Sequence, residues 1–317
     1  MAKTFLRYDC GNGVRWAQQV DGVFRPLVGH ILTTADLIGA VKGGTLTIDP
    51  DLPEVDADRC HVLSPVTRNQ QFVAQATNYA SHVREIGGDP EKIMSNVFFG
   101  KAPSSLCGAR DPIRKPARVQ LLDYEIELGL IIGKPITEPV EVTPDTLFDW
   151  VGGLTICNDV SARDIQIPEG QFYKGKSFRS FSPTGPFLVV PEPGEERKLL
   201  DLELTLWVND ERRQHATVAD MIFKPAETLT ELSEVMDLFP GDLLITGTPG
   251  GVALQPPGAV MQGIAALIPP HVRFPMFVKG QAKRSEYLKA GDIVRATIRH
   301  PDGSMALGEQ VNRVEAA

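Results

Sequence analysis

The segment LLDYEIELGLIIG, residues Leu121–Gly133, holds three acids in a strand-like apolar setting. Side chains alternate between the two faces of a strand, so Asp123, Glu125 and Glu127 share one face. The apolar residues occupy the other face and continue into residues 130–132, which are apolar on both faces like a buried strand. Adjacent like charges on one face repel, so this strand requires a positive partner.

Two interpretations of the acidic face remain open. A half-exposed strand would turn its acids to water, although no basic residue lies among them. Alternatively, two carboxylates at i and i+2 can bind one hard divalent cation, which prefers oxygen ligands. A third oxygen is available from Asp159 in GGLTICNDVSARDIQ, residues 152–166, unless Asp159 is only a turn or cap residue. Arg163 and Gln166 follow at helical spacing and suit a carboxylate ligand.

Composition excludes several function classes. The 317 residues are 42% hydrophobic, and 40 acidic residues against 32 basic ones argue against a dedicated nucleic-acid binder. No apolar run reaches membrane-spanning length and the first residues lack a signal peptide, so we expect a soluble, cytoplasmic protein without a membrane partner. The four cysteines are scattered without a CxxC pair, which predicts reduced thiols rather than a disulfide framework.

Short apolar runs separated by Gly and Pro predict a mixed, β-rich α+β fold rather than a doubly wound one. Residues 1–70 are expected to form a small N-terminal β-rich lobe, and residues 71–317 the catalytic domain. Two helices are predicted: residues 33–41, which open on a Thr/Asp cap, and residues 226–238, whose apolar residues recur at helical spacing. Residues 161–164 resemble the capping box of a third, short helix.

A second candidate group lies upstream, in ATNYASHVREIGGDP, residues 76–90. His82 and Glu85 are three residues apart and would share a helix face, as a general base and its orienting carboxylate do. Most such pairs are incidental surface contacts. A loop further on carries Lys174, Lys176 and Arg179, either as a solvated basic loop or as cations that neutralise the acids. No nucleotide-binding glycine loop and no GxSxG elbow occur.

Seven segments in order resemble the fumarylacetoacetate hydrolase superfamily, which includes acylpyruvate hydrolases, oxaloacetate decarboxylases and oxo-diacid isomerases. They are NYASHVREIGG, NVFFGKAPSSL, DYEIELGLIIGK, NDVSARDIQ, GKSF, VND and GDLLITGTPGGV. The resemblance implies a C-terminal β-roll that forms a homodimer. It also implies a set of site residues: Mg²⁺ or Mn²⁺ on Glu125, Glu127 and Asp159, with Asp123 behind them; His82 and Glu85 on a lid that activates water; Lys176 for charge stabilisation; and Arg163, Gln166 and Thr248 for substrate binding.

The implied reaction is metal-dependent hydrolysis of a C–C bond in a 2,4-dioxo acid, an acylpyruvate or fumarylpyruvate-like compound of aromatic or sugar-acid catabolism. Water attacks the distal carbonyl, and a metal-stabilised pyruvate enolate leaves. The alternative is a metal-dependent decarboxylase or isomerase of oxo-diacids. One departure from the family pattern is an apolar, Pro-rich insertion at about residues 255–289. This insertion is expected either to pack subunits together or to shape the distal end of the substrate pocket.

Overall fold

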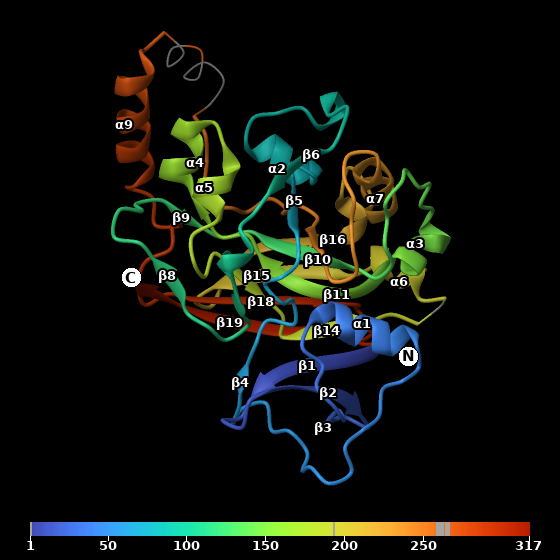
Figure 1. The fold of residues 1–317 in the computed structure, drawn as a ribbon. Helices are drawn as coiled ribbons and strands as arrows, with labels where there is room; N and C mark the ends of the chain where they lie inside the picture. The colour runs from blue at the N-terminus through green and yellow to red at the C-terminus, as the bar shows by residue number, and fades with distance from the viewer. Residues whose placement is uncertain (1, 193, 258–262, 264–266) are drawn as a thin grey trace.

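The computed structural model describes residues 2–192, 194–257, 263 and 267–317 (Figure 1). Its main sheet has twelve strands: β1 (Lys3–Asp9), β2 (Val14–Val20), β3 (Val23–Pro26), β4 (His61–Val62), β5 (Phe72–Ala76), β6 (Val97–Gly100), β7 (Leu106–Gly108), β10 (Ile126–Ile132), β11 (Val151–Asn158), β13 (Ser182–Thr184), β14 (Phe187–Val190) and β17 (Leu243–Ile245). A five-stranded sheet contains β8 (Ile113–Lys115), β15 (Glu203–Val208), β16 (Glu211–Thr217), β18 (Ile293–Arg299) and β19 (Ala306–Ala316). A short ribbon pairs β9 (Leu122–Asp123) with β12 (Ser161–Ala162).

The helices lie mainly around the edges of these sheets (Figure 1). The α-helices are α1 (Thr34–Lys42), α2 (Ala80–Glu85), α3 (Leu147–Trp150), α4 (Arg163–Glu169), α5 (Phe172–Lys176), α6 (Glu196–Leu200), α7 (Pro225–Ser233) and α9 (Pro270–Gln281). Four 3₁₀ turns, η1 (Pro90–Lys92), η2 (Pro103–Ser105), η3 (Pro144–Thr146) and η4 (Val218–Asp220), complete the described elements. The predicted mixed, β-rich α+β class is confirmed. No described helix is long and apolar enough to span a bilayer.

The main core lies between the two larger sheets. Strand β10 is central in the large sheet, antiparallel to both β11 and β17. Its Leu128 and Leu130 belong to one buried cluster with Ile156 of β11, Leu204 of β15 and Ile298 of β18. Residues 130–132 are apolar on both faces because neighbours cover the strand on either side: Leu130 and Ile132 pack in this cluster and Ile131 in a second one.

The segment that carries the three acids is buried throughout. Asp123, Glu125 and Glu127 are at most 4% exposed, so the interpretation of a half-exposed polar face is wrong. The strand is also interrupted: β9 ends at Asp123, β10 begins at Ile126, and the amide of Glu125 donates to Oδ1 of Asn158. The acids therefore lie at the start of β10, next to the end of β11.

The strands of residues 1–70, β1 to β4, do not form a separate sheet but belong to the main sheet. Strand β1 pairs with β14 of the larger unit as well as with β2 and β4. In residues 44–48 the chain pairs at a single position, the bridge between Leu27 and Ile48. The boundary at about residue 70 remains a prediction.

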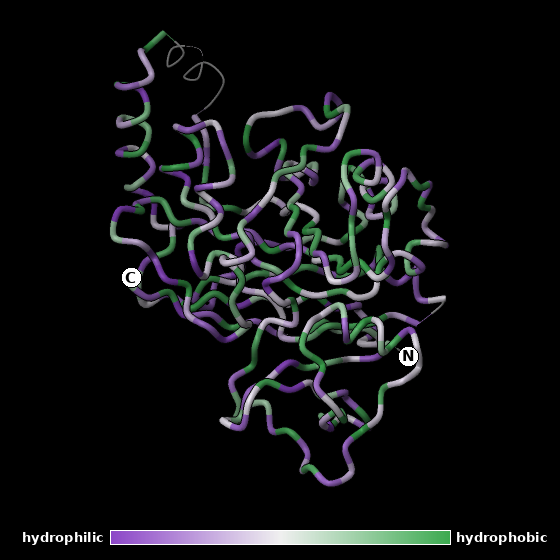
Figure 2. The backbone as a smooth tube through the Cα atoms, in the orientation of Figure 1, coloured by the Kyte–Doolittle hydropathy of each residue, from purple (hydrophilic) through white to green (hydrophobic). Residues whose placement is uncertain are grey.

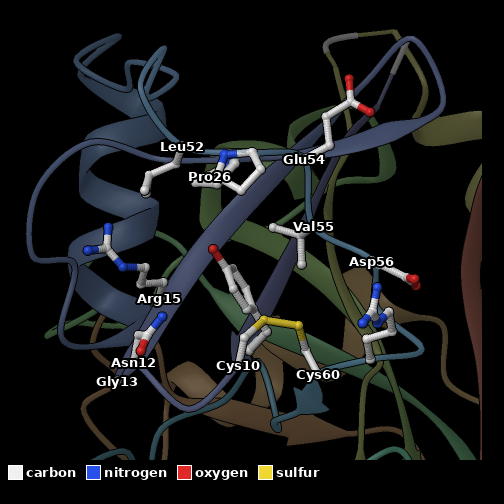
Figure 3. A pocket seen from close by; sticks show the side chains of 13 residues that line it. Cys10, Asn12, Gly13, Arg15, Pro26, Leu52, Glu54, Val55, Asp56 and Cys60 are labelled. Carbon is white, nitrogen blue, oxygen red and sulfur yellow. A yellow bond between two sulfur atoms is a disulfide. The ribbon is translucent and has the colours of Figure 1, made fainter.

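The expectation of four reduced thiols is wrong for two of them, because Cys10 and Cys60 form a disulfide (Figure 3). The antiparallel register of β1 and β4 pairs Asp9 with His61, so the next residues along, Cys10 and Cys60, stand opposite each other. Cys107 and Cys157 are free and buried. The disulfide borders a cavity of about 340 Å³ in the N-terminal lobe, which contains none of the predicted site residues. Disulfides are rare in reducing compartments, so the cytoplasmic location remains a prediction.

The predicted helix starts have mixed outcomes. Helix α1 begins with the expected capping box, in which Thr33 and Asp36 each accept from the other's backbone amide. Helix α7 covers the first part of residues 226–238. The capping box predicted at residues 161–164 is wrong, because Ser161 pairs in β12 and the carboxylate of Asp164 accepts from the amides of residues 120 and 121 instead.

The described part of residues 255–289 contains α9, which stands beside α4 and α5 (Figure 1). Hydrophilic and hydrophobic residues alternate along α9 (Figure 2). Gln281 at the end of α9 donates to the carbonyl of Gln255, so the end of α9 is linked to the start of the segment. Residues 258–262 and 264–266 of the insertion lie outside the described residues. The expected role in subunit packing, and the homodimer itself, remain predictions.

Candidate active site

Three carboxylates lie close together at the start of β10 and the end of β11. Glu125 precedes β10, Glu127 lies within it, and Asp159 directly follows β11. Each offers an oxygen, and these oxygens lie within 4.8 Å of one another. The antiparallel register, which pairs Ile126 with Asn158, places these residues side by side. The structure therefore brings together the three acids expected to hold a metal.

Asp123 lies behind this cluster and connects several elements. Its carboxylate accepts from Nε of Arg163 at 2.9 Å and from the amides of Ala253 and Leu254 at 2.7 and 3.0 Å. The same guanidinium donates from a second nitrogen to Glu125. Arg163 is 3% exposed, so Asp123 fixes a buried cation that faces the acid cluster.

Two lysines complete the charge arrangement. Lys176, at the end of α5, donates to Oε2 of Glu125 at 2.7 Å and also to Asp159. Lys101 forms an ion pair with Asp159 and donates to the carbonyl of Phe181 at 3.2 Å. Lys101 stands in the quoted segment NVFFGKAPSSL, yet sequence reasoning gave it no role, because its contact with Asp159 joins residues 58 positions apart.

Glu127 is the exception in this cluster. Among the described residues Glu127 forms no ion pair, and its one hydrogen-bond donor is the amide of Gly247 at 2.7 Å. Gly247 has φ 84°, in the left-handed region that favours glycine, and a Cβ there would meet Asn78 at 2.9 Å. Burial, then the charges of Asp159 and Glu125, raise the pKa of Glu127 well above its ordinary value.

Glu125 shows the opposite behaviour. Burial alone would raise its pKa, but Arg163 and Lys176 outweigh burial and lower the pKa to about 2. The pKa of Lys176 is raised, because Asp159 and Glu125 outweigh the burial that would lower it. The two neighbouring glutamates therefore differ: one carboxylate is ionised by its cations, and the other has no cation of its own.

The donor set fits a hard divalent cation. All candidate ligand atoms are carboxylate oxygens, which Mg²⁺ and Mn²⁺ prefer. Four acids (Asp123, Glu125, Glu127 and Asp159) face three cationic side chains (Lys101, Arg163 and Lys176), which leaves the carboxylate of Glu127 uncompensated. A buried carboxylate without a positive partner is costly unless it is protonated or binds a cation.

His82 and Glu85, the predicted general base and its orienting carboxylate, lie close together on α2. Nδ1 of His82 lies 3.6 Å from Oε2 of Glu85, and both side chains are largely buried. Glu85 also accepts from the amide of Gly251 at 3.0 Å, which ties α2 to the turn after β17. A distance of 3.6 Å is just too long for a hydrogen bond, and Nδ1 of His82 has no hydrogen-bond partner among the described residues.

These residues surround one cavity of about 160 Å³, here called the site cavity. It is lined by Gln75, Ala76, Thr77, His82, Ile86, Phe99, Glu125, Glu127, Arg163, Gln166, Phe172, Lys176, Thr248 and Leu254. Seven of the nine predicted site residues are in this lining. The other two, Glu85 and Asp159, contact lining residues: Glu85 lies next to His82, and Asp159 forms an ion pair with Lys176. None of the described residues of 255–289 lines the site cavity.

Two predicted substrate-binding side chains are held by neighbours. Oε1 of Gln166 accepts from Arg163 at 2.9 Å. The hydroxyl of Thr248 donates to the carbonyl of Ile126 and accepts from Gln214. Gln214 also accepts from the amide of Ile126, so it links both sheets beneath the site. Lys174 and Arg179, considered as further cations for this site, do not line the site cavity; Lys174 pairs with Glu169 near the surface.

Comparison with known proteins agrees with this geometry. The fumarylacetoacetate (FAA) hydrolase C-terminal family matches residues 71–315. A Burkholderia multivorans protein named provisionally as a hydrolase is 34% identical over 294 residues, covering 92% of this chain and 88% of its own. Fumarylacetoacetate hydrolase from psychrophilic Exiguobacterium antarcticum has a similar structure, with TM-score 0.74, 29% identity and coverage of 99% and 100% of the two chains. So does 2-hydroxyhepta-2,4-diene-1,7-dioate isomerase from Mycobacterium marinum, with TM-score 0.70, 26% identity and coverage of 99% and 98%.

The mixed sheets define a β-rich α+β protein, and its buried carboxylate cluster fits metal-dependent catalysis. The chain belongs to the fumarylacetoacetate hydrolase family. Its relatives and structural neighbours include both hydrolases and an isomerase by name, so family membership leaves the reaction open between these types.

Proposed function

We propose that this protein is a metal-dependent hydrolase that cleaves a C–C bond of a 2,4-dioxo acid. The observation that carries the proposal is the meeting of two groups at one cavity. Glu125, Glu127 and Asp159 offer oxygens within 4.8 Å of one another, and His82 lines the same cavity with Glu85 behind it. The cluster supplies a site for the cation, and the pair supplies a base beside it.

Glu125, Glu127 and Asp159 would hold Mg²⁺ or Mn²⁺. When bound, the cation supplies Lewis-acid polarisation of the substrate's oxygen atoms. Arg163 and Gln166 suit the substrate carboxylate, because a guanidinium and an amide together offer several donors to its oxygens.

His82 acts as the general base. It takes a proton from a water molecule, whose oxygen then forms a bond to the distal carbonyl carbon. Glu85 holds the imidazole in place and stabilises its protonated form. The bond between that carbon and the pyruvate fragment breaks, and its electron pair remains on the fragment as an enolate. Lys176 stabilises this charge, and the proton on His82 returns to the enolate carbon.

The test follows the enol absorbance of an acylpyruvate in the presence of Mg²⁺ or Mn²⁺. The absorbance is expected to fall with wild-type protein. It is expected to stay constant after chelator treatment and to fall again once the cation is restored. Glu127→Gln and His82→Ala are each expected to abolish the loss. Full activity in chelator-treated protein would show that the proposal is wrong.

The similarity to an isomerase with an oxo-diacid substrate favours a second candidate, a metal-dependent decarboxylase or isomerase that needs no water attack. His82 separates the two reactions. If His82→Ala still decarboxylates oxaloacetate while acylpyruvate hydrolysis is lost, the protein has two separable activities. If wild type converts oxo-diacids and never hydrolyses acylpyruvates, the second candidate replaces the first.

A further inference from the structure

The site cavity is lined by side chains of two chemical kinds, here called its polar half and its apolar half. The polar half comprises Gln75, Thr77, His82, Glu125, Glu127, Arg163, Gln166, Lys176 and Thr248. The apolar half is formed by side chains from five segments: Ala76 at the end of β5, Ile86 after α2, Phe99 on β6, Phe172 on α5 and Leu254 after β17. The rings of Phe99 and Phe172 lie 4.8 Å apart, and Nζ of Lys176 lies 5.5 Å from the Phe99 ring. Lys176 therefore marks the border between the halves.

The permanent cations of the cavity lining are already paired with protein groups. Arg163 donates one N–H from each of its three nitrogens, to Asp123, Glu125 and Gln166, so only the two remaining N–H groups of its terminal nitrogens are left for the single carboxylate of the substrate. Lys176 donates to Glu125 and Asp159. Among the described lining residues the apolar half contains no lysine or arginine. Residues 258–266, most of which the structure does not describe, contain no lysine, arginine or histidine either.

This arrangement limits what the tail of a substrate can carry. A carboxylate moved from water into an apolar pocket needs a cation or several donors to replace its hydration, and without them its burial is strongly unfavourable. An alkyl tail gains from the same surface, because it leaves water for contact with the aromatic rings. The cavity also holds only about 160 Å³, compared with ~300 Å³ at the lower end for drug-sized ligands, so a long tail does not fit.

We propose that the natural substrate is a 2-oxo acid with a single carboxylate and a short, uncharged tail, and that the protein discriminates against diacids. This inference rests on the proposed function, because it assumes that the single carboxylate binds at the polar half. It separates this chain from the neighbour named for a 1,7-dioate, whose substrate carries a carboxylate at both ends. Phe99 and Phe172 are the specificity-determining residues.

The test compares two acylpyruvates of the same shape, succinylpyruvate and 4-methylpentanoylpyruvate, in which an isopropyl group replaces the terminal carboxylate. We expect kcat/KM for the neutral compound to exceed that for the diacid by about 100-fold or more. An equal or higher kcat/KM for succinylpyruvate would overturn the inference.

A binding measurement keeps the inference separate from the proposed function. If neither acylpyruvate is cleaved, the proposed hydrolysis fails, and titration calorimetry with Mg²⁺ compares 2-oxoglutarate with 5-methyl-2-oxohexanoate. Tighter binding of the neutral acid supports an uncharged tail, whereas equal or tighter binding of 2-oxoglutarate overturns it.

A matched pair of variants locates the effect. Phe172→Arg places a cation in the apolar half and is expected to move the neutral-to-diacid ratio at least tenfold toward the diacid. Phe172→Leu keeps the wall uncharged and is expected to leave the ratio within about threefold of wild type. An unchanged ratio in folded Phe172→Arg would contradict the role of this wall. If Phe172→Arg does not fold, Phe99→Arg is the equivalent test on the facing ring.

Discussion

Nδ1 of His82 lies 3.6 Å from Oε2 of Glu85, one turn further along α2, and no described residue offers that nitrogen a closer acceptor. A histidine that gains a proton during the reaction is stabilised by such a carboxylate, which also holds the ring in place. The pair lies beside the acid cluster, so its contribution to catalysis can be measured separately from cation binding.

Glu85→Gln keeps the size of the side chain and removes its charge. We expect kcat to fall by about 10²-fold, because general-base catalysis contributes ~10²–10⁴-fold and its orienting charge is lost. KM is expected to change little. The control is His61→Ala, because His61 contacts Asp111 at 2.6 Å in the N-terminal lobe, away from the site cavity. Equal losses in both variants would contradict the assignment.

The pH dependence of cation binding follows from Glu127. Burial, then Asp159 and Glu125, raise its pKa, so at pH values below this raised pKa a cation must displace a proton from the carboxyl group. Affinity for Mg²⁺ is therefore expected to fall as the pH drops below this raised pKa. The free energy of unfolding of the metal-free protein depends on the same group. A carboxyl group whose pKa is raised by folding lowers this free energy at pH values above the raised pKa, and the loss disappears as the pH falls through it.

Calorimetry in two buffers of different ionisation enthalpy counts the protons released on binding. Wild type is expected to release up to one proton per cation, and the number released is expected to increase as the pH is lowered. Binding without proton release would show that Glu127 is already ionised before the cation arrives.

Thr77 holds a backbone conformation that is unusual for its type. It has φ 53°, in the left-handed region that β-branched residues rarely adopt, and it lines the site cavity. Thr77→Gly is expected to raise the free energy of unfolding by about 1 kcal/mol, because the strain is relieved. Asn209→Gly is the control: it has φ 52°, which asparagine tolerates, so a smaller gain is expected. A lower denaturation midpoint for Thr77→Gly would contradict the strain.

The disulfide between Cys10 and Cys60 closes a loop with a sequence separation of 50. Cys10→Ser is expected to lower the free energy of unfolding by about 2–4 kcal/mol, because the unfolded chain is no longer constrained. Adding a reductant should destabilise wild type by a similar amount and leave Cys10→Ser unchanged. If wild type shows no response to the reductant, the bond is absent or energetically unimportant.

The acid cluster was predictable because its signal is local. Three acids at alternate positions in an apolar segment require a positive partner wherever the strand lies, and Asp159 followed at the end of another strand. The sequence pattern indicated Arg163 as a carboxylate partner and left Lys176 open between a solvated loop and a neutralising cation; the structure adds the contacts of both with Glu125.

The remainder depends on long-range pairing. Cys10 meets Cys60 only because β4 pairs with β1, and Lys101 meets Asp159 only because β6 and β11 belong to one sheet. Neither contact leaves a periodic pattern in the sequence. The supposed cap at Ser161 was wrong for the same reason, since its partner strand β9 lies far along the chain.

The most direct test of the account is calorimetric titration of chelator-treated protein with Mg²⁺ and Mn²⁺. Wild type is expected to bind a single divalent cation at the cluster of Glu125, Glu127 and Asp159, and Glu127→Gln, which keeps the shape of the side chain, is expected to lose that binding. Wild type that binds neither cation, or Glu127→Gln that binds with wild-type affinity, would contradict it.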